Sequence, residues 1–68
     1  MEAYRITIRG QLGQRFEGAF GGMRLVPDGS QTILVGNIDD QSHLFGILDR
    51  IRALGLDLVS VVPDDGAA

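Results

Sequence analysis

The shortness of the chain is the feature that most limits its fold. A chain of 68 residues forms one domain, and a domain of this size buries only about 60% of the surface that it exposes when unfolded. The sequence has no cysteine, so neither disulfides nor thiolate metal sites can supplement the core. These facts exclude a dinucleotide-binding domain, a barrel and a multidomain enzyme. They favour a compact module that gains stability from an oligomer or a partner.

Composition and charge narrow the class of protein further. Hydrophobic residues make up 44% and charged residues 22%, as in an ordinary folded domain. The net charge of −3 disfavours binding to nucleic-acid phosphates. No apolar run approaches the roughly 18 residues of a membrane span. Residues 1–5 lack the basic and apolar regions of a signal peptide, so we expect a cytoplasmic location.

The first half of the chain predicts a strand, a helix and a hairpin. Residues 4–9 alternate apolar with polar side chains, which indicates a half-buried strand. Residues 11–21 predict a helix whose apolar face is formed by Leu12, Phe16, Ala19 and Phe20. Residues 23–26 and 31–38 predict two strands joined by the turn sequence Pro-Asp-Gly-Ser at 27–30.

The second half predicts a capped helix and a last strand. Asp39 and Asp40 suit the helix N-terminus, and Gly55 suits the position just after its end. Between them runs an apolar stripe of Leu44, Ile47, Leu48, Ile51 and Leu54. Residues 57–62 predict a strand. We therefore expect one domain over residues 1–62 and a flexible C-terminal tail over 63–68.

This order of elements predicts an α+β fold. Strand, helix, strand, strand, helix, strand is the βαββαβ order of the ferredoxin-like arrangement. We expect a four-stranded antiparallel sheet with two helices on one face.

The other face of such a sheet is not covered by its own helices. If Leu56, Leu58 and Ser60 face inward, Val59 and Val61 of the last strand face outward. The residues of the third strand that face outward are either Thr32, Leu34, Gly36 and Ile38 or Ile33, Val35 and Asn37. An apolar patch on this face favours association with a second copy, as a dimer. The predicted interface consists of Ile33, Val35, Val59 and Val61.

The loop after the first strand is a candidate anion site. Gly10 and Gly13 allow backbone N–H groups to approach an anion, and nearby arginines supply positive charge. The candidate contacts are Arg5, Arg9, Gly10, Gly13 and Arg15. A tight turn from strand to helix explains the same glycines.

No residue pattern predicts catalysis. His43 is the single histidine, and a polar position on the helix explains it. Helix capping accounts for Asp39 and Asp40, and no serine lies in a glycine-flanked elbow. We therefore predict no catalytic residue, no metal and no cofactor.

Residues 4–10, the hairpin with Pro27-Asp28-Gly29 and the helix that follows resemble the acylphosphatase family. This resemblance implies the βαββαβ fold. The loop of that family ends in a catalytic arginine, where this chain has Gly18, and its second strand carries a catalytic asparagine, which residues 23–26 lack. The resemblance therefore supports the fold and counts against the hydrolase activity.

Residues 40–48 and 53–61 resemble the helix and strand of ACT domains, which are ligand-binding regulatory modules. In those domains this pattern follows the first strand, whereas here it follows the third. The whole chain is also similar to short proteins of high-GC actinobacteria whose activity is not known.

Three hypotheses follow from these observations. The first is a non-catalytic module that forms homo-oligomers, or binds another protein, and acts through its sheet face. The second is an ACT-like sensor of a small ligand or anion at a subunit interface. The third is an acylphosphatase-like hydrolase, which the sequence supports least.

Overall fold

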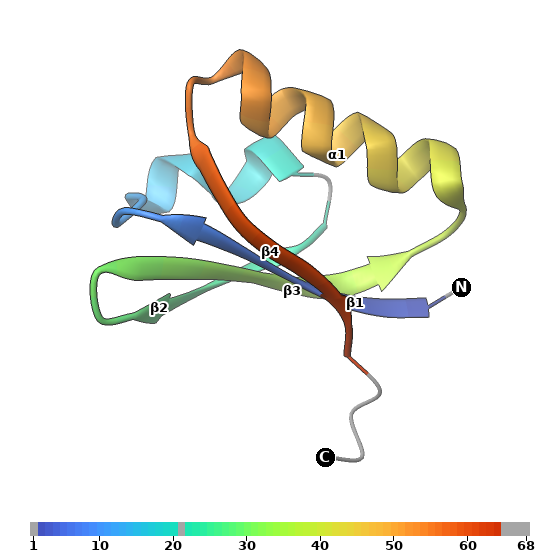
Figure 1. The fold of residues 1–68 in the computed structure, drawn as a ribbon, viewed down its shortest axis with the longest axis horizontal. Coiled ribbons are helices and arrows are strands. Elements are labelled where there is room, and N and C mark those ends of the chain that lie inside the picture. Colours follow the sequence, from blue (N-terminus) through green and yellow to red (C-terminus); the bar gives the residue numbers. More distant parts are fainter. Residues whose placement is uncertain (1, 21, 65–68) are drawn as a thin grey trace.

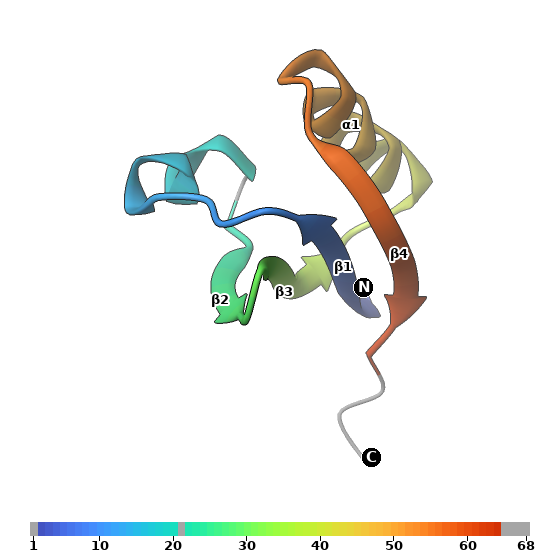
Figure 2. The ribbon, with the colours of Figure 1, turned by 60° about the vertical axis from the view of Figure 1, so that its left-hand side comes forward.

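The described residues form one four-stranded sheet with two helical segments above it. The computed structural model of the chain describes residues 2–20 and 22–64, without the side chains of residues 14, 15 and 17. In chain order the elements are β1 (Glu2–Arg9), the 3-10 helix η1 (Gln14–Phe20), β2 (Arg24–Asp28), β3 (Gln31–Ile38), α1 (Gln41–Ala53) and β4 (Asp57–Pro63). Neighbouring strands are antiparallel, in the order β2-β3-β1-β4 (Figure 1). Both α1 and η1 lie on one side of this sheet (Figure 2).

The α-helix predicted over residues 11–21 is wrong. Of the described residues in this range, Gln14–Phe20 alone are helical, and they form a 3-10 helix; Gly21 lies outside the described residues. Gly13 and Gly18 disfavour an α-helix, and a stretch this short is marginal without strong propensity. The four apolar residues of the predicted face nevertheless contact the core or belong to it. The ferredoxin-like arrangement is therefore not matched as predicted, because the structure has the antiparallel sheet but one α-helix in place of two.

The hairpin of β2 and β3 turns more tightly than the sequence predicts. Asp28 pairs with Gln31, so the turn consists of Gly29 and Ser30 alone. Gly29 has φ +61°, which the first central residue of a type II′ turn requires. Strand β2 thus includes Pro27, and it can do so because β2 is an edge strand.

Local capping signals define both ends of α1, as predicted. At the start, the side chain of Asp40 accepts a hydrogen bond of 2.9 Å from the His43 N–H. At the end, the N–H groups of Gly55 and Leu56 donate to the carbonyls of Arg52 and Ile51. This pair of bonds is a Schellman motif, and Gly55 supplies the positive φ, +74°, that it needs.

The core lies between the sheet and the two helical segments. Alternate residues of β1 and β3 point into it, among them Ile6, Ile8 and Leu34, which are fully buried. The buried residues that meet them from outside β1 and β3 are Phe20, Met23, Ile47 and Ile51. Because one parity of each strand is buried here, the other parity faces away from the helices.

Strand β4 contains an irregularity and runs further than predicted. Its register against β1 shifts between Thr7 and Ile8, which leaves Val59 as an extra residue, a β-bulge. Pro63 still belongs to the strand, and the Asp64 N–H donates a 2.8 Å hydrogen bond to the Ala3 carbonyl. Residues 63 and 64 of the predicted tail are thus paired with β1, and the flexibility of the tail stays a prediction. Residues 65–68 lie outside the described part of the chain.

Candidate functional site: the open face of the sheet

The face of the sheet opposite the helices carries three rows of side chains that extend over all four strands, and a shorter row of Ala3 and Asn37. No element that the structure describes covers this face, which we call the open face (Figure 1; Figure 2). Residues that pair across neighbouring strands lie on the same face, so the register gives the rows directly. From β2 to β4, the Arg24 row is Arg24, Val35, Arg5 and Val62; the Ile33 row is Val26, Ile33, Thr7 and Ser60; the Asp28 row is Asp28, Gln31, Arg9 and Asp57.

The open face carries four aliphatic side chains that lie among charged and polar ones. The aliphatic members are Val26, Ile33, Val35 and Val62. Val62 is 44% exposed, and the other three are partly buried among their neighbours. Arg5 forms an ion pair of 3.9 Å with Asp64 at one end. Aliphatic side chains beside arginines are among the features of protein-binding surfaces.

The structure brings together two of the four residues predicted for the interface. Ile33 and Val35 lie side by side on the open face. Val61 does not join them, because it pairs opposite the buried Ile6 and packs against the core. Val59 is the bulge residue and is 43% exposed.

The sequence prediction missed two members of the aliphatic group, Val26 and Val62. Val26 could have been found, since a two-residue turn at Gly29-Ser30 places it directly opposite Ile33. Val62 could not, because simple alternation along β4 assigns it to the core side. The bulge at Val59 reverses that assignment.

The loop of residues 10–13, predicted to bind an anion, is hydrogen-bonded to the hairpin of β2 and β3. The Gly10 N–H donates to the Ser30 carbonyl, and the Leu12 N–H donates to Oγ1 of Thr32. That hydroxyl is buried and donates in turn to the Gly10 carbonyl at 2.8 Å. The N–H groups of Gly10 and Leu12 are therefore already engaged within the protein.

Two arginines of the predicted anion site, Arg5 and Arg9, are placed on the open face of the sheet. They lie in different rows, and Arg5 is paired with Asp64. Gly13 accepts a hydrogen bond from the Phe16 N–H at the start of η1. The side chain of Arg15 lies outside the described part of the chain. Anion binding by these residues stays a prediction.

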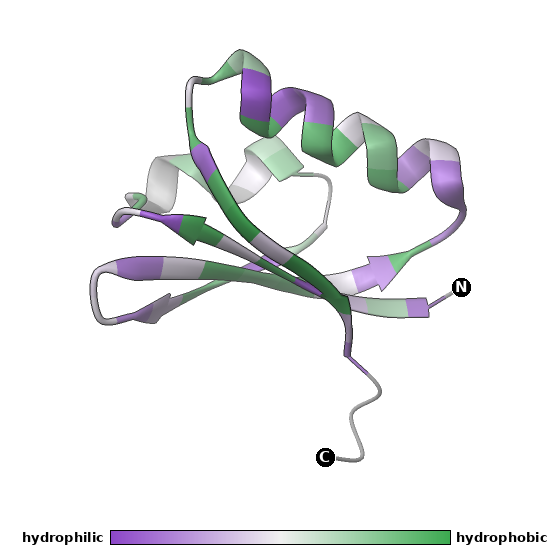
Figure 3. Ribbon diagram, in the orientation of Figure 1, coloured by the Kyte–Doolittle hydropathy of each residue, from purple (hydrophilic) through white to green (hydrophobic). Residues whose placement is uncertain are grey.

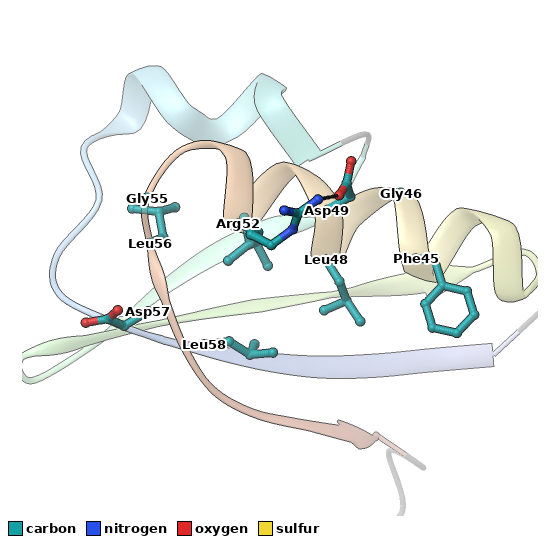
Figure 4. Close-up of a pocket in the computed structure, with 10 residues that line it drawn as sticks. Phe45, Gly46, Leu48, Asp49, Arg52, Gly55, Leu56, Asp57 and Leu58 are labelled. Carbon is teal, nitrogen blue, oxygen red and sulfur yellow. Dashed lines mark hydrogen bonds and ion pairs between the residues drawn. The ribbon is translucent and has the colours of Figure 1, made fainter.

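A second apolar surface lies on the helix side of the sheet. A groove of about 910 Å³ runs between α1 and β4, and Figure 4 shows Leu48, Leu58 and Phe45 along it. Phe45 is 60% exposed and Leu58 is 46% exposed. An ion pair between Asp49 and Arg52 lies on the helical wall of the groove. Figure 3 shows that hydrophobic residues predominate in β4, which borders this groove.

The titratable groups near the helix start perform a structural task. Nδ1 of His43 accepts a 3.0 Å hydrogen bond from the Asp39 N–H, and the Asp39 carboxylate lies 4.0 Å away. Together with the Asp40 cap, this contact fixes the turn from β3 into α1. Among the described residues, no three acidic, histidine or cysteine side chains are grouped so as to hold a metal ion.

Comparisons with known proteins place the chain in a family. Within the described residues, no helix has both the length and the apolar character needed to cross a membrane. No curated protein and no solved structure matches the chain significantly. Residues 3–62 match the family described as "Domain of unknown function (DUF8691)". The matched range covers every strand and helical segment except Glu2 at the start of β1 and Pro63 at the end of β4. The chain belongs to that family.

Proposed function

We propose that this protein is a small non-catalytic interaction module that associates with itself through the open face of its sheet. The observation that carries the proposal is the aliphatic group of Val26, Ile33, Val35 and Val62, which no described element covers. Sheets pack face to face through alternate side chains of this kind. A second copy would remove the group from water and supply the second layer that a thin domain lacks.

The size of the molecule is compatible with this role. A stable interface buries about 800 Å² per partner. The described chain has an accessible surface of 4516 Å², so such an interface needs less than a fifth of it. In Figure 1 both helical segments lie above the sheet, so the open face below it is available for such a contact.

The experiment is a mass measurement by light scattering across micromolar concentrations. We expect twice the chain mass of 7.3 kDa. Ile33→Lys should return the protein to a monomer, because the new charge would lie among the aliphatic side chains of the open face. Phe45→Lys is the matched control: it removes the most exposed large apolar side chain on the helix side and should leave the dimer intact. A wild-type monomer at all concentrations contradicts the proposal.

The groove between α1 and β4 favours a second candidate function, the binding of a small ligand. Its volume falls within the usual range for ligand sites, and most of its side chains are apolar. Arg52 could orient a polar group of such a ligand. A thermal-shift screen with amino acids, nucleotides and phosphates tests this candidate, because a bound ligand raises the melting temperature by mass action. A hit that Leu58→Asp abolishes and Ile33→Lys retains would support the groove; a screen without hits would count against it.

A further inference from the structure

Strand β2 carries opposite charges at its two ends on the open face. Arg24 and Asp28 are both exposed, and Val26 lies midway between them in the Ile33 row. Residues four apart in an extended strand are about 13 Å from each other. Within one chain the two side chains are therefore too distant to form an ion pair.

We infer that two copies pack sheet to sheet about a two-fold axis that runs across the strands along the Ile33 row, with Arg24 of each copy paired with Asp28 of the other. This inference rests on the proposed self-association. The Ile33 row lies midway between the two charged rows. Such an axis therefore maps the Arg24 row of one copy onto the Asp28 row of the other. A two-fold interface makes every such contact twice.

The same axis brings the Ile33 row of each copy against the Ile33 row of the other. Val26 and Ile33 lie on the axis, so each faces its own counterpart in the second copy. Ile33 also lies in the interior of the sheet, on β3, where neighbouring strands surround it on both sides. The Ile33 row thus forms the middle of the interface, whereas Val35 faces Gln31 and Val62 faces Asp57 of the second copy.

The alternative axis, parallel to the strands, gives a poorer match of charge. A rotation about this axis exchanges β2 with β4 and β3 with β1. Each row of one copy then faces the same row of the second copy. Asp28 would then face Asp57 of the second copy, and Arg24 would face Val62. Juxtaposed like charges are unfavourable at an interface. The axis across the strands also has one like-charge contact, between Arg5 and Arg9, but it alone forms a pair of opposite charges, Arg24 with Asp28, and charge complementarity therefore favours it.

The remaining arginines do not oppose this choice. On the axis across the strands, Arg5 of one copy faces Arg9 of the other. Arg5 is already paired with Asp64 of its own chain, at 3.9 Å. Arg9 lies opposite Asp57 in the ladder. Each cation therefore enters the interface beside an acidic residue of its own chain.

Charge reversal tests the inferred pair directly. Arg24→Asp gives a chain with acidic residues at both ends of β2, and Asp28→Arg gives one with basic residues at both ends. We expect each variant alone to dissociate at least tenfold more readily than the wild type. An equimolar mixture of the two should form a heterodimer, because each then meets the opposite charge. Arg50→Asp, on the exposed part of α1, is the control and should not change the dimer.

The outcomes separate this inference from the proposed function. A dimer that both variants leave unchanged, or a mixture that stays monomeric, overturns the inferred pair while self-association stands. A wild-type monomer overturns self-association itself. Heteronuclear spectra of each variant establish that it is folded before its mass is interpreted.

Cross-linking gives a second measurement that does not depend on charge. The natural sequence has no cysteine, so a single one can be introduced cleanly. Facing sheets lie about 10 Å apart, so a short bis-maleimide should join two copies of Ile33→Cys. Asn37→Cys lies four residues from the axis, so its two copies are about 27 Å apart and should not be joined. Efficient cross-linking of both variants would indicate the axis parallel to the strands and contradict the inference.

Discussion

The two helical segments cover the same face of the sheet but are stabilised in opposite ways. Capping bonds define α1 at both ends, and the residues that make them, Asp40 and Gly55, are close in sequence to the helix. At η1 the described bonds are those of backbone turns, from the Phe16 N–H to the Gly13 carbonyl and from the Met23 N–H to the Phe20 carbonyl. The place of η1 depends on Phe20, which is buried, and on a loop tied to the distant Thr32. The comparison shows that local signals determine regular helical structure, whereas tertiary contacts can place a segment that is only a 3-10 helix.

The largest expected effect is the loss of the buried anchor of η1. Phe20→Ala removes a side chain that is 1% exposed and leaves a cavity in the core. We expect a loss of about 3–5 kcal/mol in the free energy of unfolding, measured by denaturant titration. Phe45→Ala is the matched control on α1, where the side chain is 60% exposed, and it should change stability much less. Equal losses for the two variants would mean that η1 does not depend on tertiary packing.

Removal of the hydrogen bonds that the Thr32 hydroxyl makes with the loop of residues 10–13 should cause the next largest loss of stability. Thr32→Val keeps the shape of the side chain but leaves the Leu12 N–H and the Gly10 carbonyl without their partner. We expect a loss of about 1–3 kcal/mol, with faster amide hydrogen exchange at Leu12. Thr7→Val, on the open face, provides the comparison and should be nearly neutral in a monomer. Unchanged exchange at Leu12 would contradict the role given to this hydroxyl.

Removal of the N-cap of α1 should cause a smaller and more local loss of stability. Asp40→Ala removes the acceptor of the His43 N–H, and we expect a loss of about 0.5–2 kcal/mol. Asp39→Ala retains the backbone N–H that donates to His43, so its loss should be smaller. Circular dichroism melting curves measure both. A larger loss of stability for Asp39→Ala than for Asp40→Ala would contradict the assignment of the N-cap to Asp40.

The sequence predicts best the elements whose signals are local. The range of β3, Gln31–Ile38, agrees with the prediction, and so do the N-cap and the glycine that ends α1. The 3-10 form of η1 could not be predicted from the spacing of Leu12, Phe16 and Phe20. That spacing suits an α-helix. The hydrogen bond that holds the loop joins Leu12 to Thr32, twenty positions away, and the local sequence does not indicate it.

The candidate site was predicted only in part for a related reason. Ile33 and Val35 follow from simple alternation along β3. The assignment of Val61 and Val62 depends on one extra residue in β4, and no residue type at Val59 marks a bulge. A single-residue shift exchanges the two faces of a strand, so one irregularity changes the composition of a whole surface.

Both prolines of the chain lie in the two edge strands, Pro27 in β2 and Pro63 in β4. Asp64 donates its N–H toward β1, so the backbone of the preceding Pro63 is directed to the outer edge, where a proline offers no donor. An incoming strand at either edge would lack a ladder hydrogen bond there. The two edges thus resist the edge-to-edge addition of strands that leads to fibrils, and the sheet-to-sheet contact that we propose would end at two copies.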